Sequence, residues 1–157
     1  MDNDGTLERI AFDSSTRALD KQQALLDEIR ARTGLLLAAS PLAASLLGVR
    51  AIEQGGSLSV AVALAAFALS AAACLFVLLP RPYAFTFSLD GPSVYEELFQ
   101  LRGDPTELHR RLAYNMRAFW DANDRRIQPL FHAFRLAALL LFIEIAAFLA
   151  AVGGTLE

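Results

Sequence analysis

Three long apolar stretches dominate the pattern of hydrophobic and polar positions along the chain. No residue between positions 54 and 80 carries a formal charge, and shorter apolar runs cover residues 33–49 and 136–152. A helix needs roughly 20 apolar residues to cross the hydrocarbon of a bilayer, with about 17 as the lower limit. The pattern therefore predicts transmembrane helices over residues 33–49, 57–80 and 136–152. The soluble alternative is a helical bundle with very apolar core helices.

Positive charge is distributed unevenly between the segments that connect these stretches. Of the 14 Lys and Arg residues, only Arg50 falls in the short connection after the first apolar run. The others precede that run or lie between residues 81 and 135. Because cytoplasmic loops carry the excess of Lys and Arg, the N-terminus and residues 81–135 are expected in the cytoplasm, with the C-terminus outside. The predicted fold is an all-α membrane protein with three transmembrane helices.

Helical spacing continues outside the apolar runs. A flexible N-terminus over residues 1–13 ends at the N-cap candidates Asp13, Ser14 and Ser15, and a helix over 14–33 continues into the first span. A second helix over 106–135 continues into the third span, and the simplest packing is an antiparallel pair. Each helix carries a stripe of residues at intervals of three or four positions, which is expected to be buried between the two helices. In the first helix the stripe consists of Leu19, Gln22, Leu26, Ile29 and Thr33, and in the second of Leu108, Leu112, Asn115, Phe119, Asn123, Ile127, Leu130 and Phe134.

The segment 81–105 is expected to be a cytoplasmic linker. Its aromatic and apolar residues alternate at Tyr83, Phe85, Phe87 and Leu89. This alternation indicates either a short strand or an extended segment at the membrane interface. A short helix is expected over 93–101. Residues 153–157 form a tail, in which the final Leu-Glu resembles a cloning scar.

Composition narrows the classes of function. The apolar fraction is 55%, above the usual value of about 45–50%. A net charge of −3 supplies no basic field for nucleic acid. The single cysteine cannot form an internal disulfide, and no phosphate-binding loop, zinc pattern or nucleophile elbow occurs. We therefore expect neither an enzyme nor a cofactor.

Glu144 is predicted near the middle of the third span, where an ionised acid costs about 3 kcal/mol. Its helix face carries Ala137, Ala147 and Ala151. Because small residues allow close helix packing, this face is expected toward other helices. Ser40 and Ser70 lie at similar depth and are candidate partners. Glu144 is then either a neutral acid hydrogen-bonded to a neighbouring helix, or a polar group that lines a pore or an oligomer contact.

Two further residue sets are candidate contact sites. One face of the second span carries Ala61, Ala65, Ala68 and Ala72, which serve either packing against the first span or a subunit interface. The long helix before the third span carries Arg110, Arg111, Arg117, Arg125 and Arg126. These arginines form either a solvated face with the usual cytoplasmic charge, or a site for an anionic nucleotide or lipid headgroup.

Two segments carry a resemblance to a bacterial family. The sequences LDKQQALLDEIRARTGLLLAAS at 19–40, and LAYNM and WDAND at 112–116 and 120–124, are similar to the entry and return helices of small multi-span actinobacterial proteins. These proteins resemble the membrane effectors of Pycsar anti-phage systems, in which a cyclic pyrimidine nucleotide signals infection and the effector impairs the inner membrane. The resemblance implies a homo-oligomer in the bacterial inner (plasma) membrane. It supplies no site residue, and no separate nucleotide-binding domain is evident.

The leading hypothesis is an oligomeric membrane effector that permeabilises the bilayer or forms a channel. Its cytoplasmic helices would receive a signal from a nucleotide second messenger or from a sensor protein. The alternative is a membrane-anchored helical scaffold or binding module without pore activity. The alternative predicts that Glu144→Gln is neutral, while charge reversal at Arg110, Arg117 or Arg125 abolishes function.

Overall fold

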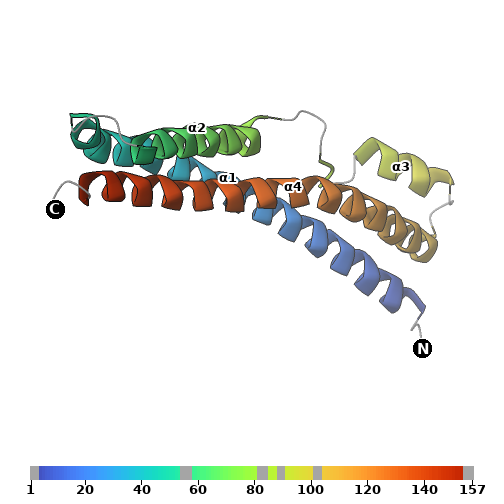
Figure 1. Ribbon diagram of the computed structural model, residues 1–157. Coiled ribbons are helices and arrows are strands. Elements are labelled where there is room, and N and C mark those ends of the chain that lie inside the picture. The colour runs from blue at the N-terminus through green and yellow to red at the C-terminus, as the bar shows by residue number, and fades with distance from the viewer. Residues whose placement is uncertain (1–3, 54–57, 81–84, 88–90, 101–103, 154–157) are drawn as a thin grey trace. The chain divides into compact units, whose positions relative to one another are not determined.

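The computed structural model describes residues 4–53, 58–80, 85–87, 91–100 and 104–153. They form the helices α1 (Asp4–Glu53), α2 (Leu58–Leu78), α3 (Gly91–Gln100) and α4 (Pro105–Gly153), and none of these residues is in a strand (Figure 1). The chain divides into two compact units. Unit 1 comprises Met1–Asp27 and Arg81–Gln128, and unit 2 comprises Glu28–Pro80 and Pro129–Glu157. Both α1 and α4 therefore contribute residues to each unit.

Two helices of the described part, α2 and α4, are long and apolar enough to cross a membrane. The predicted span over residues 33–49 lies in α1, which continues through Pro41. It is not among these two helices, and its role as a third span stays a prediction. The described residues are thus mostly helical, with none in a strand, and α2 and α4 have the composition of membrane helices.

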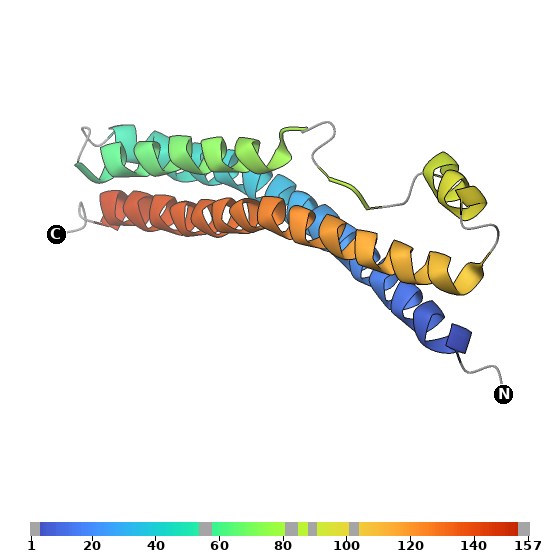
Figure 2. The ribbon, with the colours of Figure 1, turned by 90° about the vertical axis from the view of Figure 1, so that its right-hand side faces the viewer.

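The core of unit 2 is built from small and aromatic side chains of three helical segments. Val60 and Ala63 of α2 pack with Phe148 and Ala151 of α4. Gly48 of α1 faces the Phe148 ring, because a Cβ at that position would lie 3.6 Å from it. Figures 1 and 2 both show α2 beside the segments of α1 and α4 that belong to this unit. Small residues at these positions let the helices approach closely.

Polarity in unit 2 is the reverse of that in a soluble domain. The polar side chains of Thr33, Ser40, Ser70 and Glu144 are buried. Within the predicted spans the large exposed side chains are apolar on all three segments, with Leu35, Leu42 and Leu46 on α1, Leu64, Leu69 and Phe76 on α2, and Leu139, Phe142 and Leu149 on α4. Soluble domains place large apolar side chains inside and polar ones outside. This surface fits lipid as its solvent.

Unit 1 contains the contact between the first part of α1 and the first part of α4, and the two helices run parallel. Phe12, Thr16 and Gln22 of α1 contact His109, Met116 and Trp120 of α4 in the same order along both helices. The predicted antiparallel packing is therefore wrong, because each of the two helices leads in the same direction into an apolar stretch.

The predicted stripe of α1 is confirmed, since Leu19, Gln22, Leu26, Ile29 and Thr33 are all buried. In α4 the stripe is confirmed at Leu108, Leu112, Asn123, Ile127 and Leu130. The prediction was wrong at Asn115, which is exposed, because Met116 occupies the buried position one turn after Leu112.

Both long helices begin earlier than the sequence pattern indicated. The expectation of a flexible segment over residues 1–13 is corrected by α1, which begins at Asp4. Tertiary contacts account for the extra turns, since the Phe12 ring packs on the His109 ring with centroids 5.2 Å apart. Helix α4 begins at Pro105, because Asp104 Oδ1 accepts the backbone N–H of Thr106 at 3.0 Å.

The linker is described at residues 85–87, which form no strand. The Phe85 and Phe87 rings stack with centroids 5.7 Å apart, as expected for side chains on one side of an extended segment. A side chain of α4 rather than a neighbouring strand pairs with the backbone of Thr86. The strand alternative is therefore wrong at these residues, and a location at the membrane interface stays a prediction. The predicted positions Tyr83 and Leu89, and residues 154–157 of the tail, lie outside the described residues.

Candidate functional site

Glu144 is fully buried in unit 2, with 0% of its surface exposed. The Ser40 hydroxyl on α1 donates a hydrogen bond of 2.6 Å to Glu144 Oε2 on α4. The other carboxyl oxygen, Oε1, is buried without a partner in the described part of the chain. A buried ionised carboxylate with an unsatisfied oxygen is very costly, so this environment favours the neutral acid. Within one chain Glu144 has the environment of a packing contact between helices.

Ser70 was the other candidate partner of Glu144, but the structure does not bring them together. The Ser70 hydroxyl of α2 donates instead to the backbone oxygen of Ala137 on α4, at 3.1 Å. Ala137 lies about two helical turns before Glu144, so similar depth along the sequence did not determine the contact. Two polar contacts therefore connect unit 2, one from α1 to α4 and one from α2 to α4.

The alanine face of α2 points away from the core of unit 2. Its members Ala61, Ala65, Ala68 and Ala72 are all exposed. The buried face of α2 consists instead of Val60, Ala63, Ala66, Ser70, Cys74 and Val77. The interpretation that the alanine face packs against the first span is therefore wrong. Its use as a subunit interface stays a prediction.

A buried amide in unit 1 holds the linker against the helix pair. The Asn123 side chain receives the Thr86 N–H on Oδ1 at 3.1 Å and donates Nδ2–H to the Thr86 oxygen at 2.7 Å. Gln22 of α1 accepts from Asn123 at 3.5 Å and donates to the backbone oxygen of Trp120 at 3.1 Å. The sequence placed both amides on apolar stripes, which was the available signal for a buried polar contact. Their partners were not predicted.

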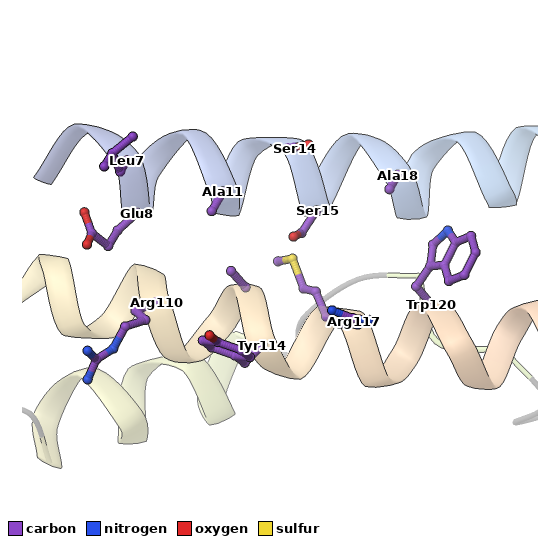
Figure 3. A pocket seen from close by; sticks show the side chains of 12 residues that line it. Leu7, Glu8, Ala11, Ser14, Ser15, Ala18, Arg110, Tyr114, Arg117 and Trp120 are labelled. Carbon is purple, nitrogen blue, oxygen red and sulfur yellow. The ribbon is translucent and has the colours of Figure 1, made fainter.

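A groove of about 520 Å³ lies along α1 and α4 in unit 1. Figure 3 shows Glu8 and Ser15 of α1 directed toward α4, and the Trp120 ring directed toward α1. Its lining residues are Leu7, Glu8, Ala11, Ser14, Ser15 and Ala18 from α1, and Arg110, Ala113, Tyr114, Met116, Arg117 and Trp120 from α4. The serines expected as helix caps therefore lie on the wall of this groove.

The candidate anion set is divided by the fold. Arg110 and Arg117 line the groove, whereas Arg111 and Arg125 do not. Arg111 Nε donates to Glu107 Oε1 at 2.9 Å, and Arg125 Nε donates to the Asp121 backbone oxygen at 3.2 Å.

The groove carries charges of both signs. Arg110 forms an ion pair with Glu107, which partly neutralises it. Arg117 has no hydrogen bond or ion pair with any residue that the structure describes. Glu8 contributes Oε2, a buried oxygen with no partner among the same residues. A carboxylate in the groove disfavours a purely anionic ligand. An amphipathic peptide with groups of both signs matches it better.

No group of three or more His, Cys, Asp or Glu residues within the described ranges has the geometry of a metal site. Comparison with known protein families, with curated proteins and with solved structures finds no match to this chain. Its features therefore define the protein only as an all-helical chain with two helices fit to cross a membrane and a mixed-charge groove in unit 1.

Proposed function

We propose that the protein is a membrane-anchored helical binding module of the bacterial inner membrane. Unit 2 crosses the bilayer three times, with residues 33–49 of α1 as the third span besides α2 and α4. The N-terminus and unit 1 are cytoplasmic, in accord with the concentration of Lys and Arg before residue 33 and between residues 81 and 135. The reversed polarity of unit 2 supports this placement, because its apolar exterior is suited to lipid.

The groove of unit 1 carries the functional part of the proposal. Its walls are apolar at Leu7, Ala11 and Ala18, and its charged groups have both signs. Helix-in-groove recognition uses this combination, in which an amphipathic helix places its apolar side on the groove and its polar groups at the rim. Glu144 supports an anchor more than a pore, because it is buried against Ser40 inside a single chain.

A photo-crosslinking experiment in intact cells tests the binding role. A photoreactive amino acid replaces Tyr114, a groove residue that is 72% exposed. We expect a crosslinked adduct that disappears when Ala11→Trp fills the groove. The same photoreactive group at Arg125, which does not line the groove, is the matched control. An equal adduct from both positions, or no adduct at Tyr114, contradicts a binding groove.

Membrane topology is tested separately with reporter fusions. We expect cytoplasmic activity from fusions at the N-terminus and after Gln100, and external activity from fusions between α1 and α2 and at the C-terminus. External activity of the fusion after Gln100 contradicts the three-span arrangement.

The second candidate function is an oligomeric effector that permeabilises the membrane. The exposed alanine face of α2 favours it, because small residues on a lipid-facing helix allow chains to associate closely. A liposome leakage assay tests this role in the presence of cyclic nucleotides, with Ala65→Leu and Ala68→Leu as interface variants. The pore hypothesis fails if wild-type protein releases no dye with any of these nucleotides.

A further inference from the structure

Helix α3 presents an aromatic pair that the rest of unit 1 does not cover. Tyr95 is 66% exposed and Phe99 is 76% exposed. Their rings stack with centroids 6.5 Å apart, which places them on one face of the helix, one turn apart. Neither residue lines the groove of its own chain. An exposed aromatic pair of this kind is typical of a contact surface.

We infer that the groove of one chain binds α3 of a second copy of this chain, an inference that rests on the proposed binding role of the groove. The apolar side chains of α3 are complementary to the apolar walls of the groove. The Tyr95 and Phe99 rings fit against the walls formed by Leu7, Ala11 and Ala18, where two alanines leave room for the approach of a helix.

Polar groups on α3 match the unpaired groups of the groove. Glu96 lies next to the aromatic face, is exposed, and has no ion pair with any residue in the described ranges. Arg117 in the groove is likewise without a partner there, and the two have opposite charges. The Tyr95 hydroxyl can donate to the Glu8 carboxylate on the groove wall. A buried Tyr hydroxyl normally finds such an acceptor.

The lengths of the two surfaces also agree. Helix α3 has 10 residues, which span about 15 Å at about 1.5 Å per residue. The α1 wall of the groove extends from Leu7 to Ala18, which is about 16 Å by the same rise. The whole of α3 therefore fits along the wall, with its aromatic face on the groove and Glu96 toward the α4 side.

This contact joins different surfaces of two chains and is therefore heterologous. Copies inserted in one membrane share the same orientation, so repetition of the contact proceeds around an axis normal to the bilayer. Such a rotation closes into a ring when the angle permits. In the smallest closed assembly, a two-fold dimer, each chain places its α3 in the groove of the other, and the interface as a whole becomes isologous.

Complementation between two charge reversals tests the inference in the full-length protein, reconstituted in nanodiscs or detergent. Glu96→Arg and Arg117→Glu each place like charges together and are expected to raise the dissociation constant of self-association about tenfold or more. Co-expression of the two single variants restores opposite charges in every mixed contact. We expect mixed oligomers to form at near the wild-type concentration, as measured by light scattering and by pull-down between differently tagged chains.

Arg125→Glu is the matched control, since it reverses the same charge on α4 outside the groove, and it should associate like the wild type. A monomeric wild-type protein overturns the inference, as does failure of the mixed variants to associate. If association is restored only when both charge reversals are in the same chain, α3 binds the groove of its own chain, and this result also overturns the inference. If the photoreactive group at Tyr114 captures a different protein while the chain stays monomeric, the inference fails but the binding role of the groove stands.

Discussion

Asn123 provides the sharpest test of how unit 1 is held together. It is 1% exposed, and its amide replaces the neighbouring strand that the Thr86 backbone lacks. Asn123→Ala removes both hydrogen bonds to Thr86 together with the longer contact to Gln22. We therefore expect the substitution to release the linker from the helix pair and to lower the free energy of unfolding of unit 1.

The expected loss follows from the contacts. The two bonds of 2.7 and 3.1 Å to Thr86 contribute about 1 kcal/mol each. Thr86 is exposed, so water replaces the lost amide on its backbone groups. Gln22 is 5% exposed, so its Oε1 stays largely buried without the Asn123 donor, at a cost of about 1 kcal/mol or more. The total is about 2–4 kcal/mol, including the space left by the side chain.

Chemical unfolding in detergent, followed by the fluorescence of the single tryptophan Trp120, measures this change, because that residue lies in unit 1. Gln128→Ala removes an exposed amide from the same helix and should change the stability by about 0.5 kcal/mol or less. Hydrogen exchange at the Thr86 amide supplies a second measurement and should accelerate in Asn123→Ala alone. The reasoning is refuted if Asn123→Ala and the control unfold alike and the Thr86 amide exchanges at the wild-type rate.

Two further substitutions test the packing of unit 2. Glu144→Leu leaves Ser40 without its acceptor and should destabilise the protein by about 1–3 kcal/mol, whereas Glu144→Gln keeps an acceptor oxygen and should stay within about 1 kcal/mol of the wild type. Denaturation in mixed micelles followed by circular dichroism measures both, and equal stability of the two variants argues against the Ser40 contact. Ala63→Leu overfills a position that is 0% exposed and should cost about 1–3 kcal/mol. Ala65→Leu, two residues on and exposed, should leave the monomer unaffected, and the reverse order of stability would show that the buried face of α2 is misassigned.

Helical periodicity predicted the stripes of α1 and most of those of α4, because each stripe contrasts with a polar opposite face. The same reasoning could not choose the buried face of α2, which is apolar on all sides. In such a helix Ala65 and Ala63 are equivalent by hydropathy, and only the shapes of the neighbouring helices distinguish them. The prediction that Glu144 faces other helices succeeded because an acid in an apolar run has few acceptable environments.

The groove could not be predicted from the sequence, for a different reason. It depends on residues 7–18 and 110–120 lying side by side, and no periodicity within one segment reports the other. Arg110 and Arg117 belonged to a set of five arginines that looked alike along the chain. Arg110 and Arg111 both contact Glu107, so only the packing of α1 against α4 separates the arginines that line the groove from Arg111 and Arg125. The early start of α1 was missed because the packing of Phe12 on His109, which joins two distant segments, stabilises its first turns.

The hydrogen bond between Ser40 and Glu144 has a consequence for the order of biosynthesis. Synthesis proceeds from the N-terminus, so in the proposed topology the segment with Ser40 enters the bilayer before α4 is made. An unpaired acid in a newly inserted helix costs on the order of 3 kcal/mol. Glu144 lies in α4, which is synthesised after α1 and α2, so its partner Ser40 is already in the bilayer when α4 is inserted. The costliest insertion step, that of α4, therefore takes place when the earlier helices can already accept Glu144.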